Sequence, residues 1–158
     1  IDKVYFDAKS SYSVGDPQIE EVFRQAHVSL PHTVVPLMRK DSLELTDEDR
    51  VLIRETILGS DNRMVLVTHG TDTMTETAKF LAGIPGKTIV LTGALIPARF
   101  RENDAIFNIG FALAATQALP AGVYIAMNGR IYDPDRVQKD REANKFVEIQ
   151  SASTDSED

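Results

Sequence analysis

The chain of 158 residues contains no cysteine, which excludes disulfides, thiol chemistry and a cysteine-ligated zinc site. Its net charge of −7 argues against nucleic acid or an anionic membrane surface as the main partner. A hydrophobic content of 42% suits one globular domain. Neither a signal peptide nor an apolar run of the roughly 18 residues that a membrane span needs is visible, so we expect a cytoplasmic protein.

Strands and helices are predicted to alternate along most of the chain. In chain order, the apolar spacing predicts a helix over 16–27, a strand over 33–38, a helix over 46–58, a strand over 64–68, a helix over 74–82, a strand over 88–92, a helix over 103–119 and strands over 122–127 and 145–149. Thr46 is the expected N-cap of the second helix, and Asn103 or Asp104 that of the last. Pro36, which lacks a backbone donor, puts the first strand near a sheet edge.

This alternation is typical of βαβ units, which build a parallel sheet with helices on both faces. The strands over 64–68, 88–92 and 122–127 are nearly continuous apolar runs, as expected when both faces of a strand are covered. We therefore predict a single, doubly wound α/β domain over residues 1–150 with a mostly parallel, flavodoxin-like sheet, since a closed barrel needs eight strands. Residues 151–158, acidic and Ser-rich, are expected to form a disordered tail.

Polar residues follow the predicted strands at the sheet edge where ligands of open α/β folds bind. Thr71 and Asp72 follow the second strand. Ser42 follows the first strand, and Lys139 lies in the segment after the fourth. Because the carboxyl ends of parallel strands share one edge, these loops should converge. They would form a site of hydroxyl, carboxylate and amine groups that uses neither histidine nor metal.

The segment after the second strand also predicts the start of a helix. Thr73 followed by Glu76 fits a capping box. Thr71 and Asp72 would then lie beside a helix N-terminus, where free N–H groups favour a carboxylate or an oxyanion. The plainer interpretation is that these residues only end a strand and cap a helix.

Taken singly, the other candidates also have plain interpretations. Lys139 could be a solvated surface lysine, Ser42 could belong to a turn before a helix, and Tyr12 could pack its ring on the domain surface.

One motif can be excluded. The segment 83–88, "GIPGKT", is similar to part of a phosphate-binding loop. However, Leu81 stands where that motif needs glycine, and the segment precedes a strand instead of following one. The three histidines are scattered, so we predict no metal site. No G-x-G-x-x-G motif occurs, so dinucleotide binding has no support, and we predict no cofactor.

Several segments match one family in order along the chain. The segment "VTHGTDTMTETAKFL" is similar to the second signature of the bacterial-type L-asparaginases. "SSYSVG" resembles the mobile loop with the family's tyrosine, "DSLELT" its D-S-x-[DE]-[ML]-T segment, "LTGALIPARFRENDAIFN" the loop after the third strand, and "DPDRVQK" the segment with its catalytic lysine. The resemblance covers the family's N-terminal domain, from residue 1 to residue 150 of this chain.

The resemblance implies a role for each matching residue. Thr71, Asp72 and Lys139 would form a hydrogen-bonded triad. Lys139 would stay cationic beside Asp72 and help Thr71 to transfer protons and activate water. Asp72 would also hold the α-ammonium of the substrate, and Ser42 its α-carboxylate.

Two more residues and the reaction itself follow from the same resemblance. Tyr12 would lie on the lid over the site, and the Ala94 backbone would cradle the side-chain amide. The implied reaction is the hydrolysis of L-asparagine to L-aspartate and ammonia through a β-aspartyl ester on a threonine. A broader asparaginase and glutaminase is the nearest alternative. The partner would be this small substrate, and the resemblance is compatible with a homo-oligomer.

The sequence departs from the family pattern at three points. The nucleophile of the family is the threonine of a T-G-G-T motif, which together with a central strand would stand immediately before Ile1. Leu43 stands where the family has glutamine. Members are longer and carry a second domain. We expect a naturally short, one-domain member, and the alternative, if the motif is truly absent, is a non-catalytic amino-acid-binding domain.

Overall fold

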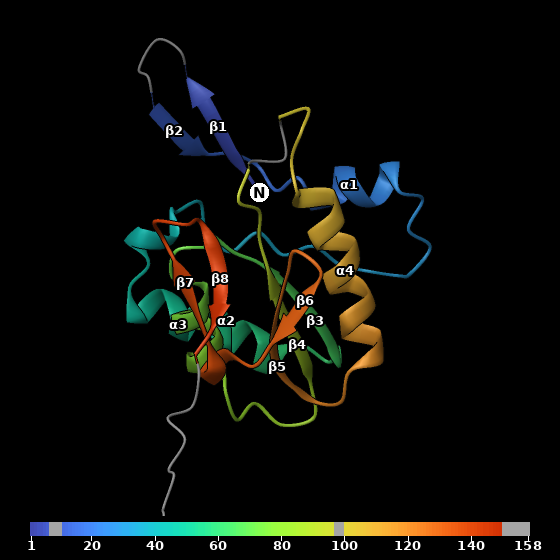
Figure 1. The fold of residues 1–158 in the computed structure, drawn as a ribbon. Coiled ribbons are helices and arrows are strands. Elements are labelled where there is room, and N and C mark those ends of the chain that lie inside the picture. Colours follow the sequence, from blue (N-terminus) through green and yellow to red (C-terminus); the bar gives the residue numbers. More distant parts are fainter. Residues whose placement is uncertain (7–10, 97–99, 150–158) are drawn as a thin grey trace, which may run out of the picture.

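The computed structural model describes residues 1–6, 11–96 and 100–149, with the backbone only for 4–6 and 11–13 (Figure 1). Its central sheet has the strand order β3 (Met64–Thr68), β4 (Thr88–Thr92), β5 (Gly122–Met127) and β6 (Arg130–Tyr132). The first three strands are parallel, and β6 returns along β5 as an antiparallel strand. The tail expected at 151–158 lies outside the described residues.

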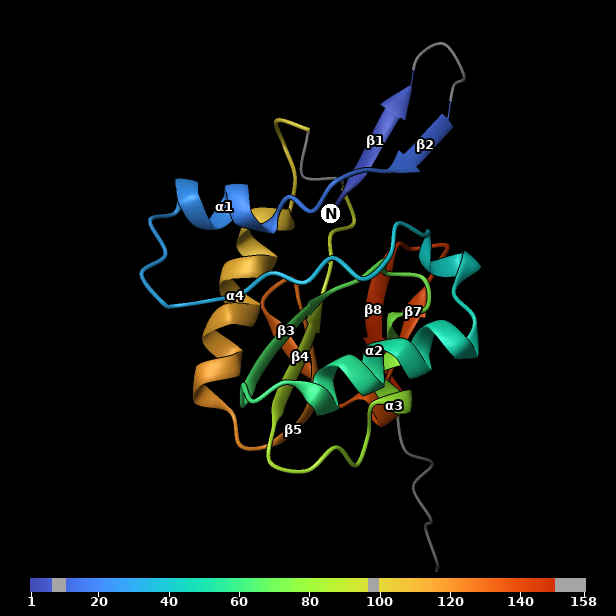
Figure 2. The same cartoon turned by 180° about the vertical axis from the view of Figure 1, so that it is seen from behind.

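Helices cover both faces of this sheet, as Figures 1 and 2 show. The helices of the described chain are α1 (Ile19–Gln25), α2 (Asp47–Gly59), α3 (Met74–Phe80) and α4 (Ala105–Ala118). Along β4, Ile89 and Leu91 pack into the core with α2 and α3, and Val90 packs with α4 on the opposite face. The doubly wound, mostly parallel α/β fold that the sequence predicts is therefore confirmed.

Two hairpins lie outside the sheet. β1 (Lys3–Phe6) pairs with β2 (Ser11–Val14) and projects beyond the end of the sheet at which β5 finishes (Figure 1). β7 (Val137–Asp140) pairs with β8 (Lys145–Glu148). The strand predicted over 145–149 is thus confirmed as β8, but its partner is a stretch that the sequence suggested was a loop.

The strand predicted over 33–38 does not form. These residues are irregular, and among the described residues no backbone hydrogen bond joins them to β3. They instead line, together with β3, a cavity of about 690 Å³. Their apolar pattern therefore marks a segment that packs without pairing, and β3 forms an edge of the sheet.

Side chains of α2 fix α3 beneath the loop that follows β3. α2 begins at Thr46, which forms the expected N-cap in a capping box with Asp49. About two turns beyond Thr46, Arg54 Nη1 donates to the carbonyl oxygens of Phe80 and Ala82 at 3.3 and 3.2 Å. These bonds satisfy carbonyls at the end of α3 that have no partner within the helix.

Candidate active site

Lys139 joins the two polar residues that follow β3. Its Nζ donates to Thr71 Oγ1 at 2.6 Å and to Asp72 Oδ1 at 2.7 Å. The side chain of Lys139 is 8% exposed, and that of Asp72 is 26% exposed. A buried ammonium needs a compensating charge, which Asp72 supplies. Hydroxyl, carboxylate and amine are therefore in direct contact, although Lys139 lies 67 positions beyond Asp72.

The β7–β8 hairpin explains why Lys139 points inward. Side chains alternate along a strand, so Val137 and Lys139 lie on the same face of β7. Val137 is fully buried in the core, and Phe146, which pairs opposite Lys139, is buried as well. The two-residue spacing from the buried Val137 therefore turns the side chain of Lys139 toward the core, once the segment is paired as a strand.

Ser42 lies against the same turn on the side of α2. It opens the short 3-10 helix η2 (Ser42–Glu44), which Asp41 caps by accepting a hydrogen bond from the backbone N–H of Leu43. Ser42 is buried, and its carbonyl oxygen accepts the hydroxyl of Thr73 at 2.7 Å. A Cβ at Gly70 would lie only 2.6 Å from Ser42 Oγ. Only glycine therefore lets the serine approach this closely.

The capping box expected from Thr73 and Glu76 is wrong. Thr73 is the N-cap of α3, but its hydroxyl donates to Ser42 and makes no capping bond to its own helix, whose first turn is fully described. Glu76 instead pairs with Nη2 of Arg50 at 3.2 Å. Both side chains thus connect α3 to neighbouring elements, a long-range use that local spacing does not reveal.

Gly70→Ala is expected to displace Ser42 and to lower the free energy of unfolding by about 1–3 kcal/mol, a usual cost of overpacking. Gly110→Ala is the matched control, because a Cβ there meets no atom within 4 Å and alanine favours a helix. Urea unfolding of both variants measures the difference. Equal stabilities of the two variants would mean that Ser42 is not fixed against Gly70.

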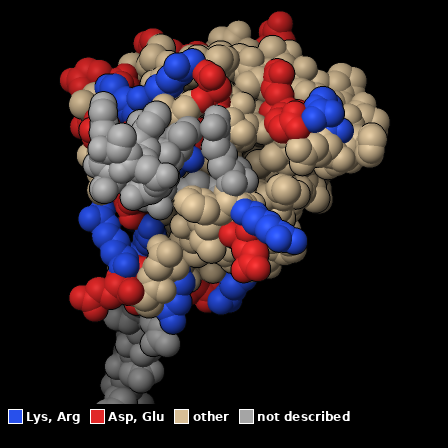
Figure 3. Space-filling view, turned by 90° about the horizontal axis from the view of Figure 1, so that it is seen from above, with Lys and Arg blue, Asp and Glu red and all other residues tan. Residues whose placement is uncertain are grey.

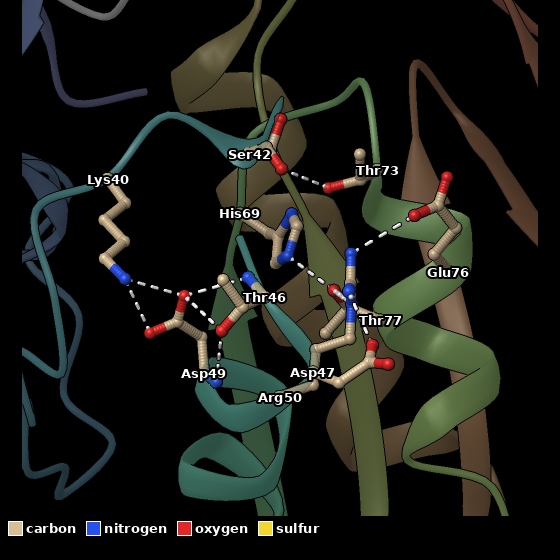
Figure 4. Close-up of polar contacts among 10 residues, drawn as sticks. All are labelled: Lys40, Ser42, Thr46, Asp47, Asp49, Arg50, His69, Thr73, Glu76 and Thr77. Atoms are coloured by element: carbon tan, nitrogen blue, oxygen red, sulfur yellow. Dashed lines mark hydrogen bonds and ion pairs between the residues drawn. The ribbon is translucent and has the colours of Figure 1, made fainter. Parts of the chain in front are cut away.

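A buried network under this turn holds His69 (Figure 4). His69 Nδ1 lies 2.6 Å from the carbonyl oxygen of Gly70, and Nε2 lies 2.8 Å from Thr77 Oγ1. A carbonyl only accepts, so we assign the imidazole proton to Nδ1, which leaves Nε2 to accept from the threonine hydroxyl. Arg50 Nε donates to the same hydroxyl oxygen at 3.2 Å, and Arg50 is itself paired with Asp47.

Burial, together with the nearby Arg50, lowers the pKa of His69 below its usual value of 6.5, and the hydrogen bond to Gly70 opposes this only in part. The unfolded chain then binds a proton below pH 6.5 that the folded chain does not bind. The free energy of unfolding is therefore expected to decrease as the pH falls below 6.5. The lowered pKa of Asp104 changes the free energy of unfolding only at and below pH 3.8. Its contribution therefore falls in a lower pH range than that of His69.

Urea unfolding at pH values between 7 and 5 measures this slope. His69→Gln, which cannot take up a proton, is expected to flatten it. An unchanged slope in His69→Gln would show that another group causes the loss.

The loop after β4 lies directly against this turn. A Cβ at Gly93 would lie 2.5 Å from the carbonyl oxygen of His69 and 3.2 Å from Thr71 Cγ2. Ala94 follows Gly93 and is half-buried. Tyr12 belongs to β2, opposite Tyr5, and its side chain lies outside the described residues.

The face above these loops carries both signs of charge. Figure 3 shows lysine and arginine interspersed with aspartate and glutamate on this face. Among the described residues, no group of three or more histidine, aspartate and glutamate side chains could hold a metal ion. In the same residues, no helix is long and apolar enough to cross a membrane.

Comparison with known proteins identifies the family. A family model described as "Asparaginase, N-terminal" matches residues 7–155. The chain belongs to the asparaginase family. As an asparaginase-family chain, it is 28% identical over 96% of its length to the glutaminase-asparaginase of Pseudomonas aeruginosa. It is 34% identical over 68% of its length to L-asparaginase 1 of Escherichia coli K12.

The fold of this asparaginase-family chain matches that of a solved relative. The thermostable L-asparaginase from Thermococcus kodakarensis superposes with a TM-score of 0.79 at 23% identity, over 94% of this chain and 48% of that one. The chain covers 38% of the Pseudomonas protein and 33% of the Escherichia coli protein. It therefore spans a minor part of the length of these curated relatives.

Proposed function

We propose that this site hydrolyses the side-chain amide of L-asparagine to L-aspartate and ammonia without a cofactor. The observation that carries the proposal is the buried contact of Lys139 with both Thr71 and Asp72. A threonine hydroxyl is a weak nucleophile and a weak acid at neutral pH, so it needs an activating neighbour. A cationic Lys139 would stabilise negative charge on Thr71 Oγ1 while that oxygen passes a proton to or from the reacting water.

The acyl-enzyme in this proposal forms on the threonine of the family's T-G-G-T motif, which the resemblance puts before Ile1. Attack of its hydroxyl on the amide carbon forms the ester bond, breaks the C–N bond and releases ammonia. Water then cleaves the ester to L-aspartate. Thr71 would move the proton between the attacking hydroxyl or water and the leaving group.

The groups around the triad suit a zwitterionic amino acid. The α-ammonium would bind the second carboxylate oxygen of Asp72, since Lys139 contacts the first. The α-carboxylate would bind at Ser42, which the close approach of Gly70 sets beside the same turn. The mixed charge of the surrounding face supports a small zwitterion over a polyanion (Figure 3).

Glutamine is expected to be a poorer substrate than asparagine. With the amino-acid head fixed between Ser42 and Asp72, one extra methylene carries the amide past the nucleophile. Such a mismatch costs about 1–3 kcal/mol, or roughly 10- to 200-fold in kcat/KM. Steady-state ammonia release by the protein as its gene encodes it, with each amide in turn, measures the ratio. Equal kcat/KM values would favour a broader glutaminase-asparaginase, the activity that the name of the Pseudomonas relative states.

A non-catalytic amino-acid-binding domain is the second candidate, because Ser42 and Asp72 could bind the charged head of an amino acid without any nucleophile. Calorimetric titration with L-asparagine separates the two candidates. Saturable heat of binding without ammonia release would favour the binding domain. Ammonia release at saturating asparagine would exclude it.

A homo-oligomer is also part of the proposal. Ile106 and Phe107 on the outer side of α4 are 51% and 60% exposed, which supports burial against another copy. Light scattering on the purified chain measures the mass. A monomer at concentrations of about 100 μM would count against self-association.

A further inference from the structure

Asp104 stands at the N-cap of α4 but does not cap that helix. Aspartate at this position ordinarily accepts a hydrogen bond from the amides of the first turn. Here the carboxylate makes no such bond, although that turn is fully described. The amide of Ala105 is instead bound by Asn103 Oδ1 at 3.0 Å. The carboxylate of Asp104 is therefore available for another use.

That carboxylate binds the loop after β4. Asp104 Oδ2 accepts the backbone N–H of Leu95 at 3.1 Å, and Oδ1 accepts that of Ile96 at 3.0 Å. The side-chain amides of Asn108 and Asn128 donate to Oδ2 at 2.9 and 3.0 Å. Burial opposes ionisation of Asp104, but the hydrogen bonds from Ile96, Asn128 and Leu95 outweigh it and lower its pKa.

Asn108 holds the other end of the same loop. Its side chain is fully buried, and Nδ2 donates to the carbonyl oxygen of Gly93 at 3.0 Å. Its Oδ1 accepts the backbone N–H of Asn128 at 2.9 Å. Gly93 is thus held on one side of Ala94, and Leu95 and Ile96 are held on the other.

The fixed loop lies at the site. Gly93 approaches His69 and Thr71 so closely that a Cβ would meet both. The backbone N–H of His69 donates to the carbonyl oxygen of Thr92 at 2.9 Å, which joins the two loops at their bases. A displacement of Ala94 would therefore change its position relative to Thr71.

We propose that Asp104 is a positioning residue that fixes the Ala94 peptide for the amide of the substrate. The inference rests on the proposed function, because it assumes that an amide binds at Ala94. Asp104 itself touches no reacting atom and acts through the Leu95 and Ile96 amides. A displacement of 1 Å at such a site can cost about a hundred-fold in rate.

Asp104→Asn tests the first part of the inference without any activity. Leu95 and Ile96 bind different oxygens of the carboxylate, and asparagine of the same shape has a donor NH₂ group in place of one of them, so one of the two bonds is lost. Hydrogen exchange of these two amides in the purified chain is expected to become about ten-fold faster or more for at least one of them, as a lost local hydrogen bond predicts. Exchange at Val90 in β4 should stay unchanged. Equal exchange of both loop amides in the variant and the parent would overturn the inference.

Thr116→Val is the matched control for general damage to α4. Thr116 is buried in the same helix, and its hydroxyl donates within that helix to the carbonyl of Leu113. This variant should leave exchange at Leu95 and Ile96 unchanged. Faster exchange in the control as well would mean that the loop responds to helix stability and not to Asp104.

The kinetic arm tests the link to catalysis. The amino-acid head would bind through Ser42 and Asp72, neither of which is among the described residues that hydrogen-bond to Asp104, so Asp104→Asn is expected to lower kcat for L-asparagine by about ten- to a hundred-fold with KM within two-fold. A raised KM at unchanged kcat, or no change in either, would overturn the positioning role. If the parent protein releases no ammonia, the proposed function fails, while the exchange experiment still reports on the loop.

Asn128→Gly keeps the inference testable if Asp104→Asn does not fold. Asn128 has a positive φ of 49°, which glycine adopts readily. The variant removes one donor that orients the Asp104 carboxylate, so this carboxylate should hold the two loop amides less firmly. It should speed exchange at Leu95 and Ile96 less than Asp104→Asn does, and an effect confined to the β5–β6 turn would contradict the inference.

Discussion

Thr71→Val is expected to lower kcat/KM for L-asparagine by about a hundred-fold or more, the usual contribution of a group that transfers protons. The substitution removes the hydroxyl that Lys139 contacts and nearly conserves the volume of the side chain. If Thr71 only ends a strand and leads into a helix, the loss should be about 1 kcal/mol of stability with turnover retained. Ammonia release and urea unfolding of the same preparation distinguish the two.

Thr71→Ser is the matched control for this prediction. It keeps a hydroxyl within reach of Lys139 and removes only the methyl group that packs near Gly93. It should retain far more activity than Thr71→Val at similar stability. A stable Thr71→Val variant with normal turnover would contradict the proton-transfer role.

Asp72→Asn and Lys139→Met are each expected to lower kcat for ammonia release severely, to a residual rate that concentrated protein still makes measurable. The two side chains form one ion pair with an Nζ–Oδ1 distance of 2.7 Å, so removal of either leaves the other without its partner. Residues that act as one catalytic unit are not additive, and the double variant should therefore be no slower than the slower single variant. Losses that multiply in the double variant would mean that the two residues act independently.

Arg130→Met is the control for the loss of an ion pair. Arg130 pairs with Glu148, and both side chains are largely exposed. Exposed pairs contribute little, typically about 0–1 kcal/mol, so stability and turnover should stay close to those of the parent. A loss as large as that of Lys139→Met would indicate damage to the hairpin region and not to the triad.

The sheet and its helices could be predicted because burial on both faces leaves continuous apolar runs in the sequence. The segment 33–38 has the same pattern and is not a strand, since local composition reports burial but not the presence of a pairing partner. The β7 strand was missed for the opposite reason. Its residues Val137–Asp140 are mostly polar, and only their pairing with β8 makes them a strand.

The candidate site could be predicted as a set of loops but not as a set of contacts. Parallel strands bring Thr71 and Asp72 to a common edge, which the sequence order implies. The inward direction of Lys139 depends on the register of an antiparallel hairpin. The partners of Thr73 and Asp104 lie on other elements, and both residues look from the sequence like ordinary helix caps.

The conversion of L-asparagine labelled with ¹⁵N in its side-chain amide tests the central claim most directly. The protein as its gene encodes it is mixed with this substrate, and the label and the carbon skeleton are followed together by NMR. The proposed site predicts that the label appears as ammonium in step with an equal amount of L-aspartate. Label that stays in asparagine in the presence of folded protein would contradict the claim that this site is an amidohydrolase.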